Sequence, residues 1–216
     1  LDLLEPGHDP AGAPDRPSVE SLVTGLGRLR VEGARSVGAA FPVDGDPVGL
    51  GGPPAFNRAA LEHGSAAVAM LADGTGVGLV PVRTGAAVAW GAHRAERRQL
   101  PDVGEADRAL RQALLEAADA LAALDVARWR PEVADRLMDL RHRGRLPAPD
   151  GVPPRCVELA ARGLQALEIA RLALEDDGGA VSASEAERRR AALLPLERTG
   201  RRALTAACSP EVWPPS

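Results

Sequence analysis

The spacing of the apolar residues changes near Leu100-Pro101, and this change constrains the fold more than any other feature of the chain. Before it, short apolar runs alternate with glycine-containing turns; after it, leucine and alanine recur at helical spacing. The first pattern is typical of hairpins and the second of amphipathic helices. The sequence therefore predicts an α+β fold, in which a small antiparallel β-meander with short helices packs against an Ala/Leu-rich helical bundle.

Turn residues divide the apolar runs of the first half. Asp73-Gly74-Thr75-Gly76 and Thr84-Gly85 separate neighbouring runs, and glycine supplies the positive φ that hairpin turns require. The runs cover residues 66–72, 77–83 and 86–93, after a strand-like run at 36–43 and short helices expected at 17–29 and 55–62. Pro81 cannot donate a hydrogen bond to a neighbouring strand, so we expect its strand to lie at an edge or to bulge there.

Helical periodicity dominates the second half. We expect helices at about residues 103–124, 131–144, 155–177 and 184–207. The last two are joined by a short turn and should lie antiparallel, with a kink or break near Pro195. That arrangement makes Cys156 and Cys208 neighbours, and two interpretations stay open: a close thiol pair, or two separately buried small side chains.

Length and composition indicate one cooperative domain with two subregions. The 216 residues carry a formal net charge of -4, and no apolar run reaches the roughly 18 residues that a membrane-spanning helix needs. We expect a flexible arm at 1–16, an α/β subregion with the antiparallel sheet at 17–100, and a helical subregion at 101–216. Two cysteines and the lack of a secretory leader favour a cytoplasmic location with reduced thiols.

The chain contains neither lysine nor tyrosine, so all 26 basic residues are arginine. P-loop NTPases and protein kinases need a lysine at the phosphates, and pyridoxal-phosphate and Schiff-base enzymes need an amine that can lose its proton. These classes are therefore excluded for the chain acting alone, as is acid–base catalysis by tyrosine. The sequence also lacks a G-x-S-x-G nucleophile elbow, and we predict no catalytic residue, no cofactor and no metal.

The loop from Asp44 to Pro54 is the best candidate for a binding segment. It combines glycines with two carboxylates and runs into a short helix, and long loops of this kind either bind ligands or wrap the core. A small-ligand pocket at this loop would use Asp44, Asp46, Asn57, His63 and His93. A metal site of His63 and His93 completed by Asp73 is an alternative, but histidines at the surface or at helix ends are the favoured interpretation.

A second glycine-rich segment, GTGVG at residues 74–78, superficially resembles a phosphate-binding loop. Such a loop opens a helix, whose N-terminus then meets the phosphate. Here a strand-like run follows instead, and the spacing does not match G-x-G-x-x-G. The segment is therefore predicted to be a structural turn.

Four segments resemble a family of uncharacterised actinobacterial proteins. They are GDPVGL at 45–50, PAFNRAALE at 54–62, DDGGAVSA at 176–183 and RRALTAAC at 201–208. The resemblance touches most of the chain from about residue 40, although each matching piece is short. It implies a conserved cytoplasmic domain and brings no catalytic motif.

Three functions follow from these observations, in decreasing order of support. The first is a non-enzymatic binding or protein-interaction module, which forms a homo-oligomer or binds a protein partner through its helical surface. The second is a small-ligand-binding domain or enzyme with a pocket near the 44–54 loop. The third is weak nucleic-acid binding through the arginine-rich helices, which the neighbouring acidic residues and the net charge of -4 disfavour.

Overall fold

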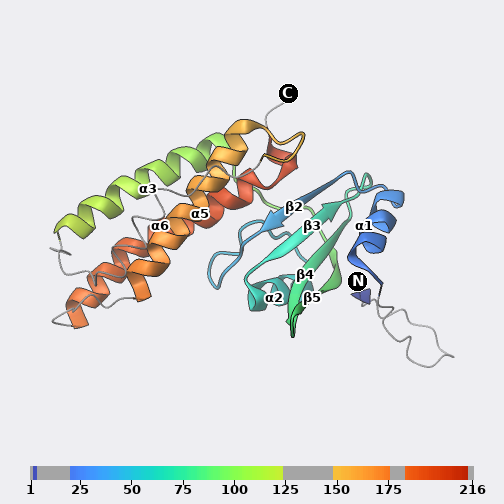
Figure 1. The fold of residues 1–216 in the computed structure, drawn as a ribbon, viewed down its shortest axis with the longest axis horizontal. Coiled ribbons are helices and arrows are strands. Elements are labelled where there is room, and N and C mark those ends of the chain that lie inside the picture. Colours follow the sequence, from blue (N-terminus) through green and yellow to red (C-terminus); the bar gives the residue numbers. More distant parts are fainter. Residues whose placement is uncertain (1, 4–19, 124–147, 176–182, 214–216) are drawn as a thin grey trace. The chain divides into compact units, whose positions relative to one another are not determined.

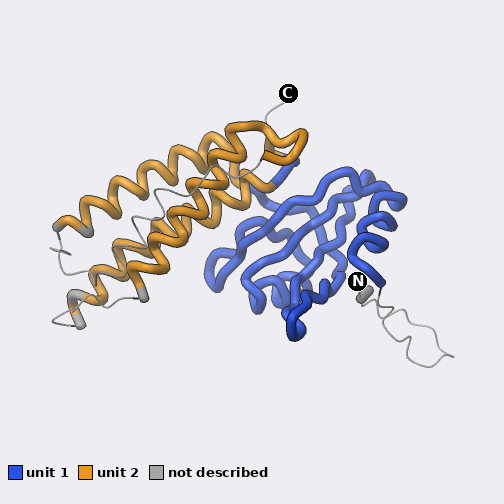
Figure 2. The backbone as a smooth tube through the Cα atoms, viewed as in Figure 1, with its two compact units in different colours: residues 1–100, 209–211 blue, residues 101–208, 212–216 orange. Residues whose placement is uncertain are grey.

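A computed structural model describes residues 2–3, 20–123, 148–175 and 183–213. The chain divides into two compact units, which are coloured separately in Figure 2. Unit 1 comprises Leu1–Leu100 with Ser209–Glu211, and unit 2 comprises Pro101–Cys208 with Val212–Ser216. The sheet and the helices of these units confirm the predicted α+β fold. The helix predicted at 131–144 lies outside the described residues.

Unit 1 is built on a five-stranded sheet with the order β1-β5-β4-β3-β2. Its strands are β1 (Asp2–Leu3), β2 (Ser36–Ala40), β3 (Ala66–Met70), β4 (Gly76–Thr84) and β5 (Ala87–Ala95). The strands from β2 to β5 pair antiparallel in chain order, as the hairpin turns predicted. The short β1 pairs parallel with β5, and the sequence pattern did not reveal it.

Pro81 lies in a central strand, but at a position where that strand has one neighbour. β4 pairs with β3 from Gly76 to Leu79 and with β5 along its whole length, where Pro81 is opposite Trp90. Since β4 extends past the end of its pairing with β3, the missing amide hydrogen of Pro81 removes no bond on that side.

A helix covers each face of this sheet (Figure 1). Side chains alternate along β3, so that Ala66 and Val68 join one apolar cluster while Ala69 joins the other. The first cluster includes Phe56 of α2 (Pro54–His63), and the second includes Leu29 of α1 (Leu22–Val31). Helix α1 begins later than its predicted start at residue 17, because the Ser21 side chain accepts the Thr24 amide and caps the first turn.

The ring of Phe56 packs directly on the backbone of β4 at Gly78. A Cβ atom at Gly78 would overlap the Phe56 ring, so glycine is required there by close approach rather than by turn geometry. Phe56 is 1% exposed and is the largest fully buried side chain. This contact holds α2 against the sheet and explains why β4 has a glycine at position 78.

In its described residues, unit 2 contains three long helices: α3 (Val103–Ala123), α5 (Pro154–Glu175) and α6 (Ala183–Ala207). Helices α5 and α6 are antiparallel, since Gly163 lies against Gly200 and Leu204 while Gly200 lies against Gly163 and Leu167. α6 continues through Pro195, so the predicted break does not form, because Leu193 and Leu196 on either side are both held in the buried core. The alternative prediction, a kink at Pro195, stays a prediction.

Alanines and leucines fill the core of unit 2. Buried members come from all three helices and include Leu110 of α3, Leu159 of α5 and Leu193 of α6. An ion pair between Asp107 and Arg162, with an N–O distance of 2.6 Å, also joins α3 to α5. Within the described part of the chain, no helix combines the length and hydropathy needed to cross a membrane.

Candidate functional site

The two predicted carboxylates of the 44–54 loop lie in a tight turn. The backbone groups of Val43 and Asp46 bond each other in both directions, at 3.2 Å and 2.9 Å, and leave Asp44 exposed at the tip. Asp46, by contrast, is 5% exposed. The two side chains therefore occupy different environments although they are close in sequence.

The remaining predicted ligand-binding residues lie on α2 and β5. The side-chain oxygen of Asn57 accepts the Gly52 amide at 3.1 Å, which ties the loop to the first turn of α2. His93 on β5 lies beside Phe56, with ring centroids 6.1 Å apart, and burial lowers its pKa. His63 is exposed at the end of α2. Each position is thus explained by the fold, and the ligand-binding role of all five residues stays a prediction.

The alternative metal site does not form among the described residues. In that part of the chain, no three His, Cys, Asp or Glu side chains are placed to hold a metal ion. Asp73 instead accepts hydrogen bonds from the Thr75 hydroxyl at 2.6 Å and the Thr75 amide at 2.9 Å, which lower its pKa. Gly76 and Gly78 then continue into β4, so the 74–78 segment is a turn and strand and does not open a helix.

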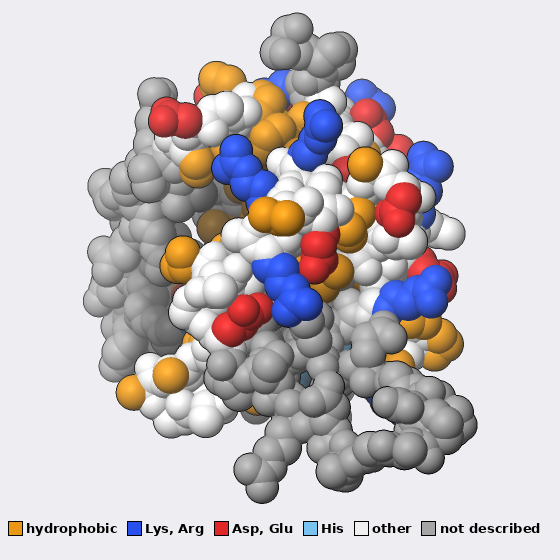
Figure 3. Space-filling model, turned by 90° about the vertical axis from the view of Figure 1, so that its right-hand side faces the viewer, with side chains coloured by type: hydrophobic (Ala, Val, Ile, Leu, Met, Phe, Trp, Pro, Cys, Tyr) orange, Lys and Arg blue, Asp and Glu red, His pale blue; other side chains and the backbone are white. Residues whose placement is uncertain are grey.

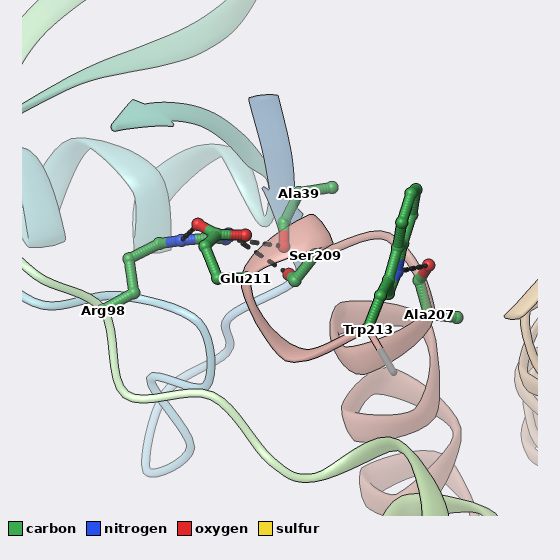
Figure 4. Close-up of polar contacts among 6 residues, drawn as sticks. All are labelled: Ala39, Arg98, Ala207, Ser209, Glu211 and Trp213. Carbon is green, nitrogen blue, oxygen red and sulfur yellow. Dashed lines mark hydrogen bonds and ion pairs between the residues drawn. The ribbon is translucent and has the colours of Figure 1, made fainter. Parts of the chain in front are cut away.

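Unit 1 also encloses the charged group of Arg98, whose side chain is 1% exposed (Figure 4). Its guanidinium donates to the Glu211 carboxylate at 2.6 Å, to the Ser209 hydroxyl at 3.2 Å and to the Ala39 carbonyl at 3.1 Å. A Cβ atom at Gly38 would overlap the guanidinium, so glycine in β2 makes room for it. These bonds hold the Ser209–Glu211 segment against β2 within unit 1.

Sequence reasoning missed this cluster because its members are far apart in the chain. Arg98 and Glu211 are separated by 113 positions, and nothing in the local pattern of either residue indicates a partner. A weak signal was present in Gly38, an isolated glycine inside a strand pattern, which often marks the close approach of another group.

A cavity of about 690 Å³ lies between α1 and β2. The chain turns from the helix to the strand through Gly33, whose φ of 105° favours glycine, and the Ala34 amide donates to the Leu29 carbonyl at 2.9 Å. The lining residues are Leu26, Leu29, Arg30, Gly33, Ala34, Arg35, Ser36 and Val37. The cavity is therefore bounded by apolar side chains and two arginines.

Exposed apolar side chains are concentrated on α1 and β2, the elements that bound this cavity, and Leu26 and Val37 line it. Of the nine large apolar side chains that are exposed among the described residues, five belong to α1 or β2: Leu22, Val23, Leu26, Val31 and Val37. Figure 3 views the molecule from the side of α1, where apolar and arginine side chains lie next to each other. Arg30 and Arg35 make no ion pair with any residue that the structure describes. We call this region, formed by α1, the 33–35 turn and β2, the α1/β2 surface.

In unit 2, Cys156 and Cys208 lie close enough to influence each other. Both lie about two helical turns from the contact of Gly163 with Gly200, at the same end of the α5–α6 pair. Burial raises the pKa of both thiols, and the neighbouring Cys156 further raises that of Cys208. The structure therefore favours the close thiol pair over two independent cysteines, and both are free.

Two family models match the chain and together span most of it. The model of the N-terminal domain of Rv1486c-like proteins matches residues 2–106, and the model of their C-terminal domain matches residues 104–205. No curated protein and no solved structure matches the chain.

Proposed function

Since the chain belongs to the family of Rv1486c-like proteins, whose domain models carry no stated activity, we propose its function from the geometry: it is a non-enzymatic protein-interaction module that docks a partner at the α1/β2 surface. The observation that carries this proposal is the 690 Å³ cavity beside an edge strand, bounded by two elements that carry five exposed apolar side chains. Apolar surface concentrated at one place on a protein marks interaction sites.

The composition of the cavity supports binding rather than catalysis. Among the residues that the structure describes, its lining holds no histidine, cysteine or carboxylate that could serve as a general base or as a thiol nucleophile. The one hydroxyl of this described lining, that of Ser36, has no such group beside it there. The two arginines and the apolar side chains of the lining instead suit a partner whose surface is negatively charged and partly apolar. The expected cytoplasmic location agrees with two free cysteines, of which Cys156 is buried.

A selection of displayed random peptides on the full chain tests this proposal. Val37→Asp places a charge on the α1/β2 surface, and Val88→Asp is its matched control, because Val37 and Val88 are both strand valines, 45% and 51% exposed. We expect the selected peptides to bind Val37→Asp about tenfold more weakly than the original chain, which is the effect of one interface residue of moderate importance. Their affinity for Val88→Asp should be unchanged. Equal binding to both variants would show that the partner docks elsewhere.

A further inference from the structure

The direction in which the backbone N–H and C=O groups of each β2 residue point can be worked out from the neighbouring β3–β4 hairpin. The Leu71 amide donates to the Thr75 carbonyl, so at Leu71 the backbone groups point toward β4. Because this direction alternates along a strand, the backbone groups of Met70, Val68 and Ala66 point toward β2. Their register partners are Ser36, Gly38 and Ala40, which therefore bond to β3.

It follows that Val37 and Ala39 direct their backbone groups away from the sheet. The hydrogen bond from Arg98 to the Ala39 carbonyl agrees with this assignment, because Arg98 approaches β2 from outside the ladder. The Arg98 cluster thus closes the edge at Ala39. Val37 has no backbone partner outside the ladder among the described residues, and by the same alternation Arg35 also faces outward. An open stretch of strand edge therefore extends from Arg35 to Val37.

The side chains of this open stretch lie on the same face as α1. Val37 is opposite Ala69, which belongs to the apolar cluster of α1, and Arg35 alternates onto the same face. The cavity, which Arg30 also lines, therefore lies next to the open backbone of β2, on the face of the sheet that α1 covers. A strand added here would direct every second side chain into the cavity or toward the two arginines.

We infer that the α1/β2 surface binds an extended acidic segment of a partner protein, which adds a sixth strand along Arg35–Val37. Backbone bonds to the open edge supply sequence-independent affinity, an apolar side chain enters the cavity, and a carboxylate two residues away on the same face meets Arg30 and Arg35. This inference rests on the proposed function and names the chemistry of its partner.

A second copy of the chain fits this edge less well. An antiparallel pairing of two copies of β2 centred on Val37 would place Arg35 of each copy beside Ala39 of the other. The Ala39 carbonyl is already bound by Arg98, and Ser209 and Glu211 stand at that position. Such a pairing would also bring the arginines of both cavities together, which like charge disfavours.

Synthetic peptides of about seven residues provide the test, since β-strand addition needs no folded partner. The acidic probe alternates threonine with one valine and two glutamates on one face. One control peptide replaces both glutamates with lysine, and another carries methyl groups on the backbone amides that would donate to β2. Fluorescence anisotropy of labelled peptides with the full chain measures binding at low ionic strength.

We expect the acidic peptide to bind at least about tenfold more tightly than either control peptide, through two charge pairs and the backbone bonds. The double variant Arg30→Glu with Arg35→Glu should reverse the preference between glutamate and lysine. The matched control is Arg58→Glu with Arg94→Glu, which changes the net charge equally at two exposed arginines outside the cavity and should leave the preference unchanged.

Equal affinity for the acidic and lysine peptides, or tolerance of the methylated amides, would overturn the inference. If peptides from the random selection nevertheless bind the α1/β2 surface and are sensitive to Val37→Asp, the proposed function survives and the partner has another chemistry. If neither the designed nor the selected peptides bind there, both fail together.

Discussion

Units 1 and 2 use small residues for different purposes. In unit 1, glycines in strands make room for large groups from elsewhere: Gly78 for the Phe56 ring and Gly38 for the Arg98 guanidinium. In unit 2, Gly163 and Gly200 allow two helix backbones to approach each other directly. The first arrangement holds a few large anchors on a sheet, and the second packs many alanines and leucines in a bundle.

This difference indicates where a partner can bind through the backbone. A helix satisfies its own N–H and C=O groups internally, whereas an edge strand presents unpaired ones. Unit 1 has such an edge at Arg35–Val37, and the exposed apolar residues are concentrated beside it. The long helices α3, α5 and α6 of unit 2 offer mainly their side chains. The contrast therefore supports the proposal that the sheet unit carries the recognition site.

The largest loss of stability is expected from Gly78→Val in unit 1. The Phe56 ring occupies the space of the new side chain, so either the ring or the strand must move, at a cost of about 1–3 kcal/mol in free energy of unfolding. Urea denaturation followed by circular dichroism measures the loss. As a control, Gly27→Ala in α1 meets open space and should stabilise by roughly 0.5–1 kcal/mol. An unchanged midpoint for Gly78→Val would show that Phe56 does not anchor α2.

A loss of stability of similar size is expected from Glu211→Ala. This change leaves the buried Arg98 without its carboxylate and should reduce the free energy of unfolding by about 1.5–3 kcal/mol. The control, Glu32→Ala, breaks an exposed pair with Arg28 and should change stability by under about 1 kcal/mol. Losses of equal size would mean that the Ser209–Glu211 segment is not part of unit 1.

The two thiols provide a probe of unit 2. Raised pKa values keep Cys156 and Cys208 protonated where an ordinary thiol, with a pKa of 9.0, begins to ionise. Alkylation by iodoacetamide at about pH 8 should therefore be several-fold slower for the folded chain than for the urea-unfolded chain. Since the folded pKa values are raised, these groups stabilise the fold below the unfolded pKa and lose that contribution at higher pH. Equal alkylation rates would contradict their burial.

The smallest effect concerns His93 in unit 1. Burial lowers its pKa below the ordinary 6.5, so the unfolded chain binds a proton more readily than the folded chain. The free energy of unfolding should decrease as the pH falls below that unfolded value, and His93→Gln should weaken this decrease. His63→Gln, at an exposed position, serves as the control. Identical pH profiles for both variants would exclude a contribution from His93.

Local chemistry explains which elements the sequence could predict. The Asp73-Gly74 and Thr84-Gly85 turns set the hairpins β3–β4 and β4–β5, because glycine at positive φ is recognisable without knowledge of the rest of the fold. Helical periodicity likewise predicted α3, α5 and α6 to within a few residues. In these segments the pattern and the turn residues point to the same structure.

The candidate site could not be predicted in this way, because it depends on long-range contacts. The position of α1 beside the cavity depends on Leu29, which packs against strands β3, β4 and β5, and the closed part of the edge requires Glu211 to reach Arg98. Of the kink or break predicted at Pro195, the break does not form, because burial of the flanking leucines outweighs the loss of one helical hydrogen bond. Tertiary packing decided each of these features.

Amide hydrogen exchange along β2 in the full-length free protein tests the open edge most directly. If Arg35–Val37 is unpaired, the amide of Val37 exchanges rapidly while that of Gly38, bonded to β3, is protected. Slow exchange at Val37, comparable to that at Gly38, would contradict the open edge and remove the basis for strand addition at unit 1.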